Sequence, residues 1–218
     1  MSARYDLVIF DVDGTMLDTT DGVLSSVRYT IDKFGFSMLS EQELSTFIGP
    51  PIQDSFALHY GLSGGILQDI ATVFRDQYKD VDLLKATPYD GIYEVFDKLM
   101  KHGVKTAVAT YKREDYAVTL LKHYGFDRYT DIMHGGDHEN KLKKCDIIEK
   151  CISESGVTDK SRVVMIGDTA NDAIGAEKIG VDFIAVTYGF GFKSHNDLSE
   201  IRNSGCVDRP VELLDIIL

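Results

Sequence analysis

The stretch "LVIFDVDGTMLDTT", residues 7–20, places a run of apolar residues directly before three aspartates. Such a run predicts a short strand that is buried on both faces, as in a parallel sheet. Side chains two positions apart on a strand project to the same side, so Asp11 and Asp13 can face one pocket. Gly14 lets the backbone turn sharply and come close to a ligand. The stretch therefore predicts a strand that ends at a binding site.

Apolar runs of this kind recur along the chain. They lie at residues 5–10, 104–110, 162–167 and 182–189, with a weaker one at 129–135. Helical patterns separate them. Strand alternating with helix predicts an α/β fold with a Rossmann-like, doubly wound parallel sheet.

The helical patterns are clearest after the middle of the chain. Residues 90–103 carry apolar side chains at helical spacing, with Asp90 placed to cap the start and Gly103 the end. The predicted buried face consists of Ile92, Val95, Phe96, Leu99 and Met100. Residues 113–125 repeat the arrangement. Each helix is expected to pack one face on the sheet.

The region from about residue 21 to about residue 86 differs, because it has helical periodicity and no convincing strand. Pro88 discourages a continuous helix at its far edge. We therefore expect an all-α subdomain inserted into the sheet domain. The expected division is residues 1–18 and 87–218 for the α/β core and residues 19–86 for the helical insertion.

Composition limits the possible partners. The formal net charge is -12, from 23 basic and 35 acidic residues, which argues against nucleic acid or a membrane surface as a partner. An anionic substrate would need a local cation. Cys145, Cys151 and Cys206 form no CxxC pair and are odd in number, so neither a disulfide framework nor a zinc ribbon is expected. No apolar segment reaches the length of a membrane span. These features predict a soluble, cytoplasmic protein.

A second acidic turn follows another apolar run, in "VVMIGDTANDA". Asp168 follows the run directly and Asp172 lies one helical turn later, so both can face one cleft. Asp168 could also be only a helix cap, and the first turn only a polar turn. If the two acidic turns adjoin, their carboxylates need a bound cation, and oxygen ligands alone favour Mg²⁺.

Four motifs together resemble the haloacid dehalogenase superfamily of phosphohydrolases. They are "DVDGT", the Thr that ends "TAVAT", a downstream Lys and "GDTANDA". The inserted helices are similar to the α-helical cap of that superfamily. "FIGPPIQDSF" (47–56) and "TPYDGIYEVFDKL" (87–99) look most like its phosphoglycolate-phosphatase-like branch. The resemblance covers essentially the whole chain.

The resemblance implies roles for the carboxylates. Asp11 would be the nucleophile that forms a phosphoaspartyl intermediate, and Asp13 the general acid and base. Mg²⁺ would be held by the Asp11 carboxylate, the Asp13 backbone carbonyl and Asp168. Asp172 would orient a metal-bound water or the catalytic lysine. Asp18 would lie near the hinge to the cap and cap the helix that follows.

The resemblance also implies a phosphate site made of Gly14, Thr110, the amide of Tyr111 and a lysine. Thr110 could instead be a strand residue that caps the next helix. Tyr111 departs from the small residue or Asn that usually follows this Thr in the family. The lysine is one of Lys141, Lys143 and Lys144; Lys144 is preferred because it stands two residues before an "Asp-Ile-Ile" segment.

Two further segments carry weaker signals. His134, Asp137 and His138 could suggest a transition-metal site, but the glycines between the histidines disfavour the helix that HxxxH needs, so a loop is expected. "YGFGFKSHN", residues 188–196, lacks the GxGxxG spacing and is expected to be a connection.

The resemblance implies a magnesium-dependent phosphomonoesterase acting on a small phosphorylated metabolite, either phosphoglycolate-like or a nucleoside 5'-monophosphate. The enzyme would act as a monomer or homodimer. A phosphosugar mutase of the β-phosphoglucomutase type and a noncatalytic phosphate-binding module remain open. Thr15, after the glycine of "DVDGT", looks more like phosphatases than like that mutase.

Overall fold

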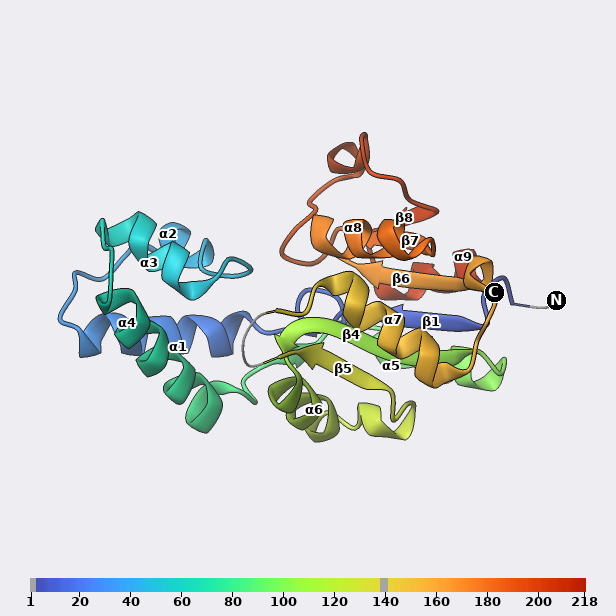
Figure 1. Cartoon of the computed structure of the whole chain (residues 1–218), viewed down its shortest axis with the longest axis horizontal. Coiled ribbons are helices and arrows are strands. Elements are labelled where there is room, and N and C mark those ends of the chain that lie inside the picture. Colours follow the sequence, from blue (N-terminus) through green and yellow to red (C-terminus); the bar gives the residue numbers. More distant parts are fainter. Residues whose placement is uncertain (1–2, 138–140) are drawn as a thin grey trace. The chain divides into compact units, whose positions relative to one another are not determined.

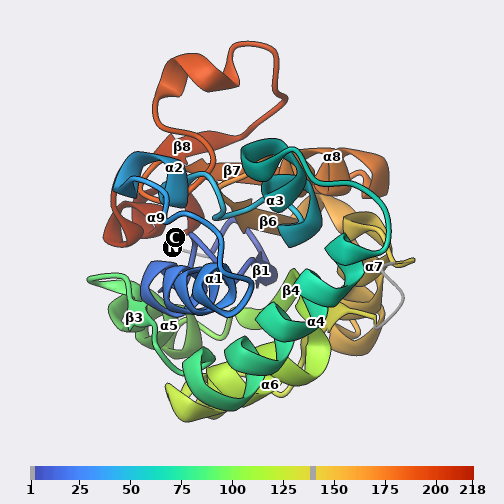
Figure 2. The same cartoon turned by 90° about the vertical axis from the view of Figure 1, so that its left-hand side faces the viewer.

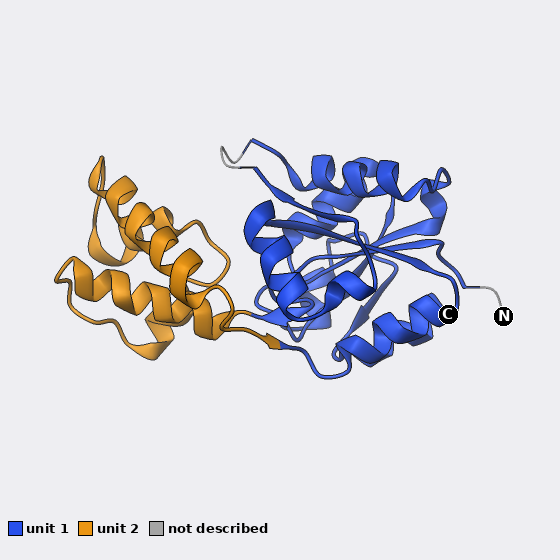
Figure 3. Cartoon of the chain, turned by 90° about the horizontal axis from the view of Figure 1, so that it is seen from below, with its two compact units in different colours: residues 1–18, 88–218 blue, residues 19–87 orange. Residues whose placement is uncertain are grey.

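The computed structural model describes residues 3–137 and 141–218. The chain divides into two compact units, residues 1–18 with 88–218 and residues 19–87 (Figure 3). We call the first the core unit and the second the helical unit. The core unit contains the sheet with its flanking helices.

A six-stranded parallel sheet runs through the described part of the core unit (Figure 1), in the order β5-β4-β1-β6-β7-β8. Its strands are β1 (Leu7–Phe10), β4 (Lys105–Arg113), β5 (Met133–Gly136), β6 (Val163–Gly167), β7 (Asp182–Val186) and β8 (Gly205–Val207). The predicted α/β fold with a doubly wound parallel sheet is confirmed. β8 was not predicted because it has only three residues, and β4 continues three residues beyond its predicted end.

Helices cover both faces of this sheet. They are α5 (Ile92–Lys101), α6 (Glu114–His123), α7 (Lys144–Ser155), α8 (Ala170–Ile179) and α9 (Leu213–Ile217), with short 3-10 turns at Phe126–Arg128, Lys160–Arg162, His195–Leu198 and Pro210–Glu212. Leu7 and Ile9 of β1 share one buried cluster with Ile148 of α7 and Ala176 of α8. The alternate residue Phe10 stacks on Phe96 of α5 at 4.5 Å between ring centroids. Figure 2 shows α7 and α8 on one side of the strands and α5 and α9 on the other.

Two details of α5 differ from the prediction. Its N-cap is Gly91, with a left-handed φ of 82°, and no side chain caps the helix, so the predicted cap by Asp90 is wrong. Met100 is 53% exposed rather than buried. Met100 lies at the edge of the apolar face, where helical spacing alone does not decide burial.

The helical unit contains α1 (Thr20–Lys33), α2 (Glu41–Ser45), α3 (Ile52–Tyr60), α4 (Ile66–Gln77) and the π-helical turn Tyr78–Asp82. Its helices share a buried cluster that includes Ile31, Phe47, Phe56 and Ile70. Two short strands, β2 (Leu17–Asp18) and β3 (Thr87–Pro88), pair with each other where the chain passes from one unit to the other.

The first helix corrects the prediction for Asp18. Asp18 lies in β2, and the N-cap position of α1 belongs to Thr19 instead.

Among the described residues, no helix has the length and apolar character needed to cross a membrane.

The register of the sheet determines where the polar residues lie. β1 pairs in parallel with β4 on one side and β6 on the other. The carboxyl ends of these strands therefore share one edge, where ligands bind in doubly wound sheets. Asp11, Thr110 and Asp168 all fall at this edge.

Phe96 should contribute strongly to the stability of the core unit. It is fully buried and contacts the rings of Phe10, Phe126 and Tyr129. We expect Phe96→Ala to lower the free energy of unfolding by about 3–5 kcal/mol. Met100→Ala on the same helix is the control and should change it by about 0.5 kcal/mol or less. Urea unfolding followed by circular dichroism measures both, and equal effects would contradict the assigned helix face.

Candidate active site

Three buried carboxylates gather at the carboxyl edge of the sheet. Asp11 follows β1, Asp168 follows β6, and Asp172 lies in the first turn of α8. One oxygen of each lies within 4.8 Å of one oxygen of each of the others. Like charges at this separation repel in a buried site, so the cluster needs cations.

Lys144 supplies one cation. Its Nζ lies 2.7 Å from Asp11 Oδ1 and 2.6 Å from Asp172 Oδ1, and its side chain is 3% exposed. It is the first residue of α7, while Lys141 and Lys143 are exposed on the preceding segment. Of the three lysines considered from the sequence, the structure brings Lys144 to the carboxylates.

The loop after β7 holds Asp168 from the other side. The backbone N–H groups of Phe190 and Gly191 donate to Asp168 Oδ2 at 2.7 and 3.0 Å. A Cβ on Gly189 would lie 2.1 Å from the Gly14 carbonyl oxygen, and one on Gly14 would lie 2.3 Å from Asp168 Oδ2. These two positions therefore require glycine for the close approach of the backbones.

The second oxygen of Asp168 is available to a ligand. Asp168 Oδ1 is buried, and no hydrogen-bond donor in the described part of the chain reaches it. A buried carboxylate oxygen without a partner is costly unless a proton or a cation satisfies it. A cation held by oxygen ligands fits this position.

Asp13 is held apart from the cluster. Its Oδ1 lies 3.0 Å from the Nζ of Lys112, whose side chain is 9% exposed. Lys112 stands two residues after Thr110 on β4, in the stretch where the pairing of β4 with β5 shifts register. Asp13 thus has its own cation, and its side chain does not belong to the three-carboxylate cluster among the described residues.

Thr110 and Tyr111 form hydrogen bonds at the same carboxyl edge of the sheet. The buried hydroxyl of Thr110 accepts a hydrogen bond from the Lys112 N–H at 3.2 Å and can still donate its own proton. The Tyr111 hydroxyl accepts from the backbone N–H of Lys144 at 2.9 Å. Tyr111 therefore joins the end of β4 to the start of α7. The N-cap of α6 is Arg113, so the alternative in which Thr110 caps this helix is wrong.

Two further alternatives that the sequence left open concern Asp168 as a helix cap and His134 as a metal ligand. The N-cap of α8 is Thr169, which pairs with Asp172 in a capping box, so Asp168 is not the helix cap. His134 lies in β5, and its two ring nitrogens contact different carboxylates, Glu114 at 3.4 Å and Glu154 at 2.7 Å. His138 lies outside the described residues. The described residues form no three-ligand group around His134.

Comparison with known proteins identifies the family of this chain. Residues 8–186 match the family described as haloacid dehalogenase-like hydrolase. The chain belongs to this family. The family and the hydrolase class predicted from the motifs are confirmed.

This haloacid dehalogenase-like hydrolase is similar to known proteins over most of its length. It is 30% identical to a 5'-nucleotidase of Pseudomonas aeruginosa, over 86% of this chain and 85% of that protein. It is 33% identical to a phosphoglycolate phosphatase of Agrobacterium fabrum, over 84% and 81%. The crystal structure of a putative phosphatase from Clostridium difficile superposes with a TM-score of 0.92, at 32% identity and 99% coverage of both chains.

Burial shifts the pKa values of the cluster. Burial raises the pKa of Asp11 to about 7; Lys144 opposes the rise, and the neighbouring carboxylates add to it. Burial raises the pKa of Asp168 to about 6, against the N–H groups that donate to it. The pKa of Lys144 is also raised, because Asp11 and Asp172 outweigh the effect of burial. Burial therefore opposes the ionisation of Asp11 and Asp168, while Lys144 favours the ionised form of Asp11.

Two parts of this site were not predicted from the sequence. Lys112 was not predicted, because its contact with Asp13 joins two distant parts of the chain. The loop 188–192 was expected only as a connection, yet its amides position Asp168. Its alternating glycines were the available signal, since glycine permits this backbone approach.

The raised pKa values predict that Mg²⁺ stabilises the protein more at pH 8 than at pH 5. Unfolded carboxyl groups have pKa values near 3.9, and the folded values are about 7 for Asp11 and about 6 for Asp168. Without metal, the folded state binds more protons between these values, so its stability falls as the pH rises through about 4 to 7. Protons compete with the metal over the upper part of that range.

Melting temperatures with and without Mg²⁺ at the two pH values measure this effect. Asp168→Asn is the control and should lose most of the Mg²⁺-induced increase at pH 8. An equal increase at pH 5 and pH 8 in the unmodified protein would contradict the assignment.

Proposed function

We propose that the protein is a magnesium-dependent phosphomonoesterase that acts on a small phosphorylated metabolite through a phosphoaspartyl intermediate on Asp11. The observation that carries this proposal is the buried group of Asp11, Asp168 and Asp172 with Lys144 between Asp11 and Asp172. A carboxylate nucleophile beside a metal site and a fixed ammonium suits attack on an anionic phosphoryl group.

The donor set fits Mg²⁺. Asp11 and Asp168 offer carboxylate oxygens, including the buried Asp168 Oδ1 that has no other partner among the described residues. The Asp13 backbone carbonyl is proposed as a further ligand. Asp172 is proposed to orient Lys144, since both of its oxygens are engaged, Oδ1 with Lys144 and Oδ2 with Thr169. When bound, Mg²⁺ would neutralise charge on the phosphoryl oxygens.

In the first step, a carboxylate oxygen of Asp11 forms a bond to phosphorus as the bond to the leaving oxygen breaks. The leaving oxygen takes its electron pair and a proton from the Asp13 carboxyl group, and the alcohol departs. In the second step, a water oxygen bonds to phosphorus and gives its proton to Asp13. The bond to Asp11 breaks, which restores its carboxylate and releases inorganic phosphate.

The remaining site residues are proposed to hold the phosphoryl group. The Thr110 hydroxyl and the Tyr111 amide donate to its oxygens, and Lys144 supplies positive charge. Gly14 allows the backbone to approach. The helical unit is proposed to act as the cap that the family resemblance implies.

The substrate class rests on the relatives. Their names include a 5'-nucleotidase and a phosphoglycolate phosphatase, which supports a small phosphomonoester as substrate.

The proposal also places the protein in a reducing cytoplasm. Its three cysteines are free thiols, which agrees with such a compartment.

Release of inorganic phosphate tests the function. With Mg²⁺, the purified protein should release phosphate from 2-phosphoglycolate or from nucleoside 5'-monophosphates. Isomerisation of a sugar phosphate without phosphate release would favour a mutase. A lack of release from every monoester, p-nitrophenyl phosphate included, would favour a noncatalytic module.

Substitution of the two aspartates of "DVDGT" should have different effects. Asp11→Asn should abolish turnover, because the amide is a poor nucleophile. Asp13→Asn should lower the turnover of alkyl phosphates by roughly 100- to 10,000-fold. It should slow phosphorylation by p-nitrophenyl phosphate much less, because p-nitrophenolate hardly needs a proton.

Rapid-quench measurement of the phosphorylation step checks this prediction. An equal loss of rate for alkyl and p-nitrophenyl substrates in Asp13→Asn would argue against Asp13 as the acid.

A further inference from the structure

Lys112 is a second cation near the carboxylates, and the proposed reaction does not use it. Its Nζ lies 3.0 Å from Asp13 Oδ1, and its side chain is 9% exposed. Lysine is rarely buried without a reason, since removing an ammonium from water is costly. Its position next to the proposed general acid is therefore informative.

The two lysines serve different parts of the site. Lys144 contacts Asp11 and Asp172, so its charge acts where the phosphoryl group is transferred. Lys112 contacts Asp13, which must lie within hydrogen-bond reach of the leaving oxygen if it is to protonate it. Lys112 and the leaving oxygen are thus both neighbours of the Asp13 carboxyl group. The charge of Lys112 acts where the leaving group lies.

We propose that Lys112 selects phosphomonoesters whose leaving group carries an anionic group next to the ester oxygen. The carboxylate of 2-phosphoglycolate, two bonds from its ester oxygen, is such a group, whereas the ribose of a nucleoside 5'-monophosphate is neutral there. The inference rests on the proposed function and names the substrate class of the same site.

Electrostatics support this selectivity. The site contains the carboxylates of Asp11, Asp168 and Asp172, so an additional anion on the substrate would be repelled without a nearby cation. An ammonium on a side chain that is only 9% exposed attracts such an anion more strongly than one in open solvent, because water screens the charge less. A charge-assisted contact of this kind corresponds to a preference of roughly 10- to 100-fold.

A purely structural ion pair between Lys112 and Asp13 is the competing explanation, and it predicts a different result. If Lys112 only held Asp13 in place, its loss would slow all alkyl phosphates equally. If Lys112 also contacts the leaving group, its loss would slow the anionic substrate more. The ratio between two matched substrates separates these cases.

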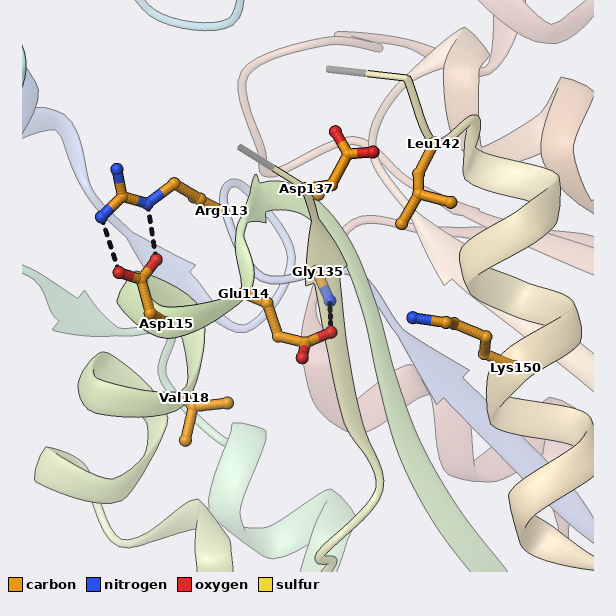
Figure 4. A pocket seen from close by; sticks show the side chains of 9 residues that line it. Arg113, Glu114, Asp115, Val118, Gly135, Asp137, Leu142 and Lys150 are labelled. Carbon is orange, nitrogen blue, oxygen red and sulfur yellow. Dashed lines mark hydrogen bonds and ion pairs between the residues drawn. The ribbon is translucent and has the colours of Figure 1, made fainter. Parts of the chain in front are cut away.

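Arg113 provides a matched control because it is the next residue and also a cation. Its guanidinium donates to both oxygens of Asp115 at 2.6 Å (Figure 4). Arg113 lines a cavity of about 560 Å³ together with Glu114 and Asp115, and the three clustered carboxylates do not line this cavity. Its charge is engaged away from Asp13, so its loss should not change the selectivity.

The experiment compares kcat/KM for 2-phosphoglycolate and for 2-hydroxyethyl phosphate. The second substrate is an analogue whose leaving group is neutral. The unmodified enzyme should prefer 2-phosphoglycolate by roughly 10- to 100-fold. Lys112→Met should reduce the preference to less than about 3-fold, and Lys112→Arg should retain most of it. Arg113→Met should keep the unmodified preference. Circular dichroism verifies that each variant is folded.

Each outcome decides the inference. An unmodified enzyme without the preference would overturn it, as would a Lys112→Met variant that is slower on both substrates with an unchanged ratio. If Lys112→Met does not fold, competitive inhibition of the unmodified enzyme provides the second test. Glycolate should inhibit at least 10-fold more strongly than ethylene glycol. Equal inhibition by the two compounds would overturn the inference. Failure to release phosphate from either substrate and from p-nitrophenyl phosphate would overturn the proposed function, and the inference with it.

Discussion

The contact between Lys144 and the carboxylates of Asp11 and Asp172 is the interaction on which the rest of the site depends. Three carboxylates within 4.8 Å of one another would repel strongly in a buried setting. The Nζ of Lys144 lies 2.7 Å from one of them and 2.6 Å from another, so a single cation offsets part of that repulsion. Burial raises the pKa values of Asp11 and Asp168, and the remaining repulsion adds to the rise. The excess negative charge of this site favours a bound divalent cation.

The sheet makes this arrangement possible. β1 lies between β4 and β6 in a parallel register, so residues that follow all three strands share one edge. The apolar residues of β1 are buried on both faces by helices, which fixes the strand on which Asp11 depends. The hydroxyl of Tyr111 then ties β4 to the start of α7, the helix that carries Lys144. Ordinary packing of the core therefore positions the polar groups.

Much of this site could be predicted from the sequence, because strand alternation and the order of the motifs place Asp11, Asp168 and Asp172 at strand ends or one helical turn later. The glycines of the loop 188–192 indicated a close backbone approach, but not its partner Asp168, which the amides of Phe190 and Gly191 reach across 22 and 23 residues by tertiary contact. The cap at Gly91 and the exposure of Met100 were missed for a similar reason. Local propensity favours Asp as a cap and apolar residues as buried, but the packing of α5 decides both.

The central claim is that Asp11 carries the phosphoryl group during turnover. The most direct test is to quench the enzyme with acid while it turns over 2-phosphoglycolate with Mg²⁺, reduce the protein with borohydride and map its peptides by mass spectrometry. An acyl phosphate on Asp11 would be reduced to homoserine, so the account predicts a homoserine at position 11 that appears only when substrate is present. Modification of a different residue, or none during active phosphate release, would contradict the account.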